Sequence, residues 1–392
     1  MTDVGTSEER SRFVNVVVAW REVRGATAAA SAGVGVLLLR RAGILHGWTA
    51  LLFAAALIVC TPTAESLARR LLFTGCIGLG WLPVLWWWHL PTAGEGRVGL
   101  LLALTAAGLT GWAAGGDQPL QRLRALLPRV RMLDVLPLAA GAAAVTVTSP
   151  WLRVENARQA LAMLVPGWDY SAHFDMTYMI RLHGVTVDQL PTSPDGTAWA
   201  YHDYPQGFHA LAAALIELMS GPHAGAAAVE LVRFTHATAV LFVVAVTVVV
   251  AGLCSLPRAC RHPAWLVPLS VLVTAAFVLG PGAVALQGGF PNFILAVGLV
   301  CSALLVAVSM PRPLMPVPLA AVLGAAVGVA HDWVLLLTLA VPALAVGAMR
   351  WRPASWTASR RRTQVALCWL SLRRAASPEL WASSRRSTWE PC

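Results

Sequence analysis

Charged side chains are scarce in this chain. They make up 12% of its 392 residues, whereas 57% of the residues are hydrophobic. A soluble domain carries about twice that share of charge, so the composition excludes a soluble globular protein and indicates an integral membrane protein. The apolar runs lack the period-two alternation of a lipid-facing strand and approach the length of a helical span. We therefore expect a helical bundle, because backbone exposed to lipid must satisfy its own hydrogen bonds.

Other missing features narrow the class of protein further. The seven cysteines include no close pair of the metal-ligand type in the polar part of the chain, so they indicate neither a zinc site nor a disulfide framework. No cleavable signal peptide is visible, because residues 1–24 are polar and the first apolar run has no convincing cleavage site. The net charge of +10 comes from arginine, which in a membrane protein marks cytoplasmic loops more often than a nucleic-acid partner. We expect a multi-pass protein of the plasma (inner) membrane with no nucleic-acid partner.

The hydrophobic runs predict an all-α polytopic membrane protein with about 10–12 transmembrane helices and one large extracytoplasmic loop carrying short helices. A charged leader at 1–25, expected in the cytosol, precedes an N-terminal transmembrane block at 26–132, a core at 133–348 and a basic tail at 349–392 that is disordered or out of its natural frame. The expected spans are 26–39, 42–60, 71–90, 98–114, 133–149, 234–253, 264–286, 290–309, 314–330 and 333–348.

The arginine-rich loop at 122–131 is the strongest marker of topology. The positive-inside rule places it in the cytoplasm, so the span at 133–149 crosses outward and residues 150–207 lie outside the cell. The same alternation places Arg40 and Arg41 outside, against the rule. A re-entrant first hairpin is one explanation of that exception.

Titratable groups concentrate in the long polar interval at 150–209 and alternate there with aromatic residues. A helix that starts at Asp169 places His173 one turn further on the same face, whereas Asp175 points elsewhere. Three interpretations stay open for Asp169. It caps the helix, or it binds a divalent cation such as Mg or Mn with His173 and with Asp203 or His209 brought in by folding. Alternatively it acts as a base, while His173 orients it or binds a phosphate.

A second cluster, WAYHDYPQGFH at 199–209, alternates aromatic and polar residues before a helix. It is either an interfacial aromatic belt or a rim on which a sugar ring stacks. His331 and Asp332 lie between two apolar runs and can reach the same cavity. The candidate site residues are Asp169 as the catalytic group and, for substrate binding, His173, Asp175, Trp199, Tyr201, His202, Asp203, Tyr204, His209, His331 and Asp332.

A span followed by GWDYSAHF, and then YPQGFH entering further helices, resembles a poorly characterised bacterial branch of the GT-C superfamily of membrane glycosyltransferases. The resemblance covers roughly residues 133–348. It implies a polyprenyl-phosphate-linked sugar as donor and an acidic residue of the first extracytoplasmic loop as the catalytic base or the neighbour of the donor phosphate. Asp169 matches that position.

We therefore expect an enzyme that moves a sugar from a polyprenyl-phosphate donor to a glycan or lipid acceptor of the cell envelope. Asp169 would deprotonate the acceptor hydroxyl, and a protonated histidine or a metal would offset the charge of the leaving lipid phosphate. The alternatives are a transporter or flippase for an envelope precursor, which favours broken helices, and a non-catalytic protein of envelope assembly.

Overall fold

The computed structural model describes residues 5–90, 94–309, 316–339 and 341, with side chains from residue 20 onward. In this part of the chain every regular element is a helix. Seven helices there are long and apolar enough to cross a membrane, which confirms the all-α polytopic class. They are Trp20–Arg41, Gly96–Ala114, Met132–Leu152, Ala227–Leu253, Pro263–Gln287, Pro291–Ser309 and Pro316–Leu339. Two shorter apolar helices, Gly47–Cys60 and Gly207–Ser220, accompany them. The basic tail expected at 349–392 lies outside the described residues.

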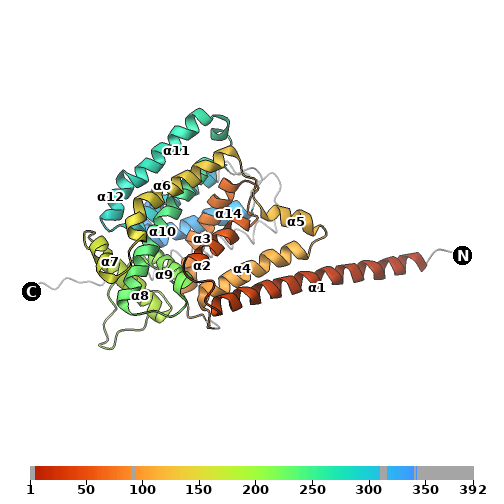
Figure 1. Ribbon diagram of the computed structural model, residues 1–392, viewed down its shortest axis with the longest axis horizontal. Coiled ribbons are helices and arrows are strands. Elements are labelled where there is room, and N and C mark those ends of the chain that lie inside the picture. Colours follow the sequence, from red (N-terminus) through yellow and green to blue (C-terminus); the bar gives the residue numbers. More distant parts are fainter. Residues whose placement is uncertain (1–4, 91–93, 310–315, 340, 342–392) are drawn as a thin grey trace, which may run out of the picture.

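Helix α10 (Ala227–Leu253) forms the centre of the bundle (Figure 1). It packs against α6 (Val135–Leu152), α13 (Pro291–Ser309) and α3 (Leu67–Trp81), and α14 (Pro316–Trp333) lies against α3 and α13. Beyond His236 its sequence is apolar on all sides, which is typical of a helix surrounded by others, and 72% of its most apolar stretch is buried.

Helix α1 (Gly5–Arg41) packs along α4 (Gly96–Ala114) and projects from the bundle (Figure 1). Only 11% of its apolar stretch is buried, so most of this surface is available to lipid. A side chain at Gly25 would come within 2.9 Å of the Gly115 Cα atom, so the two helices approach closely through glycine. The leader expected at 1–25 forms, from Gly5 onward, the first part of this helix.

The span expected at 264–286 is divided into two helices. Helix α11 (Pro263–Val278) ends before Gly280, and α12 (Pro281–Gln287) begins at a proline. Pro281 has no N–H to donate into the preceding turn, so the break follows from the sequence. The two parts cover one edge of the bundle (Figure 1).

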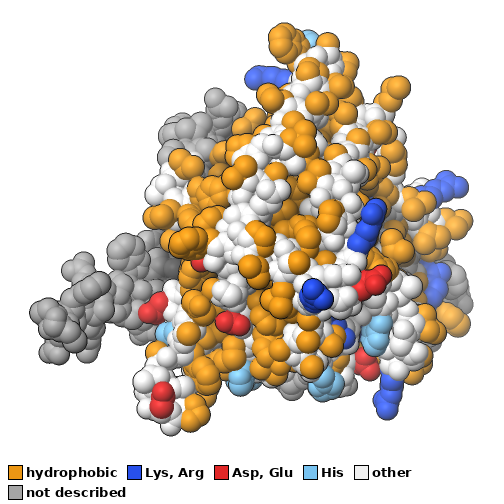
Figure 2. Space-filling model, turned by 60° about the vertical axis from the view of Figure 1, so that its left-hand side comes forward, with side chains coloured by type: hydrophobic (Ala, Val, Ile, Leu, Met, Phe, Trp, Pro, Cys, Tyr) orange, Lys and Arg blue, Asp and Glu red, His pale blue; other side chains and the backbone are white. Residues whose placement is uncertain are grey.

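The polar interval and the arginine-rich loop lie at opposite ends of α10. Near the start of α10, the His236 ring bonds to the carbonyl of Val154, at 2.9 Å. At its other end, Arg131 donates to the carbonyl of Cys254, at 3.1 Å. A helix of this length, 27 residues, spans about 40 Å, enough to cross a bilayer. We call the two ends the α8 end and the Arg131 end; Figure 2 shows the apolar flank between them.

The interval itself carries α7 (Ala157–Leu164), α8 (Tyr170–His183) and the short helix Val187–Gln189, and then enters α9 (Gly207–Ser220). Helices α8 and α9 pack on each other and on α10. The arrangement therefore brings the beginnings of α8, α9 and α13 together at one end of the bundle.

Burial accounts for one of the two residues in the apparent exception to the positive-inside rule, since Arg40 is buried and Arg41 is exposed. Arg40 is 1% exposed and donates to the carbonyls of Leu45, Glu217 and Leu218, the last two at the end of α9. The carbonyl end of a helix is its negative pole, so a cation is stabilised there. Arg40 is thus a structural residue, and a short turn joins α1 to α2 (Gly47–Cys60).

Candidate functional site

The site begins at Asp169, the residue immediately before α8. Its side chain is half-buried and makes no capping hydrogen bond, so the capping interpretation is not what the structure shows. The segment before α13 fixes this position. The Trp168 N–H donates to the Gly288 carbonyl at 2.9 Å, and a side chain at Gly289 would lie 2.7 Å from the Asp169 nitrogen. Gly289 also has a φ of 89°, which favours glycine.

His173 lies one turn into α8 and is completely buried beside His209 of α9. The rings stack, and His173 Nδ1 lies 2.8 Å from His209 Nε2. His173 Nε2 lies 3.1 Å from the carbonyl oxygen of Gly289, which can only accept. In the neutral pair, His173 Nε2–H donates to Gly289 and His209 Nε2–H donates to His173 Nδ1. The hydrogen bonds therefore fix both tautomers.

Burial lowers the pKa of His173 to about 4, although the charge of Asp169 and the Gly289 carbonyl act in the opposite direction. The ring is therefore neutral at pH 7. This differs from the expectation that a protonated histidine here would balance a lipid phosphate. The pair is suited instead to holding neighbouring groups in a fixed geometry.

A second set of groups reaches the same place from α13 and α14. Asn292 Nδ2 donates to the Tyr204 hydroxyl at 3.1 Å and approaches the Asp332 carbonyl at 3.5 Å. The Tyr204 ring packs edge-on against the rings of both His173 and His209. Burial raises the pKa of Tyr204; the hydrogen bond with Asn292 lowers it, and the negative charge of Asp169 raises it. The histidine pair, Tyr204 and Asn292 thus form one connected group, and the charge of Asp169 acts on both His173 and Tyr204.

Asp332 is 1% exposed, and among the described residues its carboxyl group has only the backbone N–H of Phe208 nearby, without a hydrogen bond of normal geometry. The carboxyl group lies against the first turn of α9, where a side chain at Gly207 would come within 2.5 Å of Oδ1. A buried acid without a partner in a candidate span is a default functional group.

Of the predicted residues, the structure brings together Asp169, His173, Tyr204, His209 and Asp332. The others are placed differently. Asp175, Tyr201 and Asp203 are exposed, and His202 is half-buried. Trp199 donates to the Pro191 carbonyl at 2.7 Å within its own loop, and His331 packs on Trp87 with ring centres 4.5 Å apart.

Sequence reasoning missed Asn292 and Gln206. Gln206 accepts from the Val187 N–H at 2.6 Å and fixes the entry into α9. Asn292 is a polar residue at the start of an apolar helix, next to Pro291, and that contrast was the available signal.

The possible Mg or Mn site gains no support. Among the described residues, no group of three or more His, Cys, Asp and Glu side chains is placed to hold a metal ion. Both ring nitrogens of His173 are already in hydrogen bonds. In this geometry Asp169 and His173 do not form the expected pair of metal ligands.

No family model, curated protein or solved structure matches this chain. The resemblance to the GT-C superfamily therefore depends on the motifs GWDYSAHF and YPQGFH alone. Both motifs contribute side chains to the site, His173 from the first and Tyr204 and His209 from the second.

Proposed function

We propose that the chain is a membrane glycosyltransferase of GT-C type that uses a polyprenyl-phosphate sugar. One observation carries the proposal: Asp169 is a half-buried acid free of any capping bond, and it lies beside a neutral histidine pair and Tyr204 at the end of a membrane bundle. Such a group can accept a proton. The acceptor is an envelope glycan or lipid, on the outer face if the topology prediction holds.

In this mechanism the acceptor hydroxyl oxygen attacks the anomeric carbon of the sugar. The bond between that carbon and the phosphate oxygen breaks, and the polyprenyl phosphate leaves with the electron pair. Asp169 takes the hydroxyl proton and later releases it to water. Tyr204 and Asn292 supply hydrogen-bonding groups for the sugar, and the histidine pair holds the start of α8 against Gly289.

Substitution of Asp169 by Asn tests this proposal. Asn keeps the size of the side chain but cannot take the proton, and loss of a general base costs about 10² to 10⁴ in rate. The assay is transfer from a radiolabelled polyprenyl-phosphate sugar by the purified protein in liposomes. Asp203→Asn is the matched control, because Asp203 is exposed in the same polar interval. Equal transfer by Asp169→Asn and the control would refute the assignment.

A transporter or flippase for a lipid-linked precursor is the second candidate. The break between α11 and α12 favours it, because broken helices are typical of transporters. Movement of a fluorescent lipid-linked sugar across proteoliposomes, with no product of transfer, would select this function.

A further inference from the structure

A cleft separate from the histidine pair opens at the α8 end of the bundle, between α2, α9 and α10. Its volume is about 390 Å³, within the range of small-molecule sites. The residues that line it are His46, Gly47, Trp48, Met219, Ser220, Arg233 and His236. Arg181 adjoins this cleft through Glu230. It lies eight residues after His173, about 12 Å along α8, which separates the cleft from the histidine pair.

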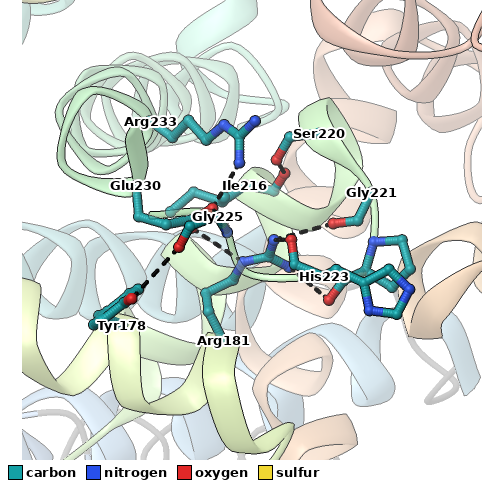
Figure 3. A network of polar contacts seen from close by, with 10 residues as sticks. Tyr178, Arg181, Ile216, Ser220, Gly221, His223, Gly225, Glu230 and Arg233 are labelled. Atoms are coloured by element: carbon teal, nitrogen blue, oxygen red, sulfur yellow. Dashed lines mark hydrogen bonds and ion pairs between the residues drawn. The ribbon is translucent and has the colours of Figure 1, made fainter. Parts of the chain in front are cut away.

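Among the described residues, the one charged side chain in the lining of the cleft is the guanidinium group of Arg233. Glu230 is buried and pairs with two guanidinium groups, Arg181 at 3.3 Å and Arg233 at 2.6 Å (Figure 3). Arg181 is turned inward, where it also donates to the carbonyls of residues 221–223. Arg233 lines the cleft, and its side chain is 29% exposed. Arg233 uses one nitrogen for Glu230, so its other guanidinium N–H groups are available to a ligand in the cleft.

The histidines of the cleft supply hydrogen bonds. Burial lowers the pKa of His46, Arg40 lowers it further and Glu95 acts in the opposite direction, so the ring is neutral at pH 7. The Val154 carbonyl can only accept, so His236 Nε2 carries a proton and donates to it. The hydrogen bond does not use His236 Nδ1. The lining thus combines one cation with neutral polar groups.

The rim of the cleft is apolar and faces lipid. Trp48 is 54% exposed, Leu52 on the next turn of α2 is 71% exposed, and Val229 at the start of α10 is 47% exposed. Tryptophan is enriched at the level of lipid headgroups. A molecule with a negative head in the cleft would therefore extend its apolar part along α2.

We propose that this cleft binds a phosphate ester through Arg233, with a lipid headgroup as the favoured source. A guanidinium group forms strong, charge-assisted hydrogen bonds with phosphate oxygens. The proposal does not depend on the transferase activity, because the cleft and the Asp169 site are formed by different side chains.

Calorimetric titration of the purified full-length protein in non-ionic detergent tests this site. The probes are dihexanoyl phosphatidic acid, dihexanoyl phosphatidylcholine and inorganic phosphate. We expect phosphatidic acid to bind at least tenfold more tightly than phosphatidylcholine, and Arg233→Gln to weaken it at least tenfold. Arg233→Lys keeps the charge and should lose less. Arg158→Gln, an exposed arginine at the same end, should bind as the native protein does.

The source of the phosphate follows from the remaining comparisons. Trp48→Ala should weaken binding of the lipid and leave binding of inorganic phosphate unchanged. If inorganic phosphate binds as tightly as the lipid and with the same dependence on Arg233, the ligand is a soluble phosphate ester. Equal affinity for phosphatidylcholine and phosphatidic acid, or equal losses in Arg233→Gln and Arg158→Gln, would overturn the proposal. If Arg233→Gln does not fold, the Lys and Trp48 variants decide in the same way.

Discussion

Glu230 offers a direct measure of what the buried ion-pair network contributes to stability. Its carboxylate is 1% exposed and receives hydrogen bonds from Arg181, Arg233 and the Gly225 N–H (Figure 3). Glu230→Gln keeps the shape but removes the charge, and its NH₂ group must then face a donor. Breaking one side of a buried ion pair costs about 3–5 kcal/mol. For a chain of this size, about 2 °C of melting temperature corresponds to each kcal/mol, so we expect a decrease of about 6–10 °C.

The assay is thermal unfolding in detergent, followed by tryptophan fluorescence. Glu65→Gln is a well-matched control, because Glu65 pairs with Arg129 at 3.3 Å, the same distance as the pair of Glu230 with Arg181. The control pair is exposed, 82% and 84% against 2% and 1%, and Glu65 has one charged partner where Glu230 has two. An exposed pair contributes little, so Glu65→Gln should leave the melting temperature unchanged. Similar small shifts in both variants would refute the reasoning that burial makes this network important.

Three other predictions concern the site and its topology. Gly207→Ala should destabilise the protein by about 1–3 kcal/mol, because the new methyl group would lie 2.5 Å from a buried carboxyl oxygen. Gly35→Ala is the control and should not destabilise the protein, because a methyl group there meets nothing within 4 Å. Equal melting temperatures of the two variants would contradict this prediction. The folded-state pKa of His173 is lowered from 6.5 to about 4, so its contribution to stability is complete above pH 6.5 and is lost as the pH falls toward 4. The stability of His173→Gln should therefore depend less on pH between about 4 and 6.5. An unchanged pH dependence would contradict this prediction. In a cysteine-free background, Ser193→Cys should react with an impermeant reagent in intact cells and Gln121→Cys only after lysis; the reverse pattern would invert the topology.

The helical class was predictable because the bilayer imposes it. Span length and composition follow from the apolar runs, and the division at Pro281 follows from the missing N–H. The helix starting at Tyr170 also follows from local pattern, and it places His173 one turn after Asp169. These features depend on neighbours in sequence, which is what periodicity reports.

The partners of those residues were not predictable in the same way. His209 meets His173 from another helix, and Asn292 and Gly289 come from a segment more than a hundred residues further along. Burial also decides the protonation of His173, and burial depends on the packed fold. A single sequence gives the chemical types of these groups but not their distances.

Arg40 has a consequence for the order in which the protein is made. Its acceptor, the Leu218 carbonyl, lies 178 residues later in the chain. At about 5–20 residues per second, synthesis supplies that acceptor roughly 10–40 s after Arg40 itself. During this interval the guanidinium group must extend to the water interface from the end of the first span. The first two helices of the N-terminal block therefore complete their native contacts only after the ribosome has passed α9.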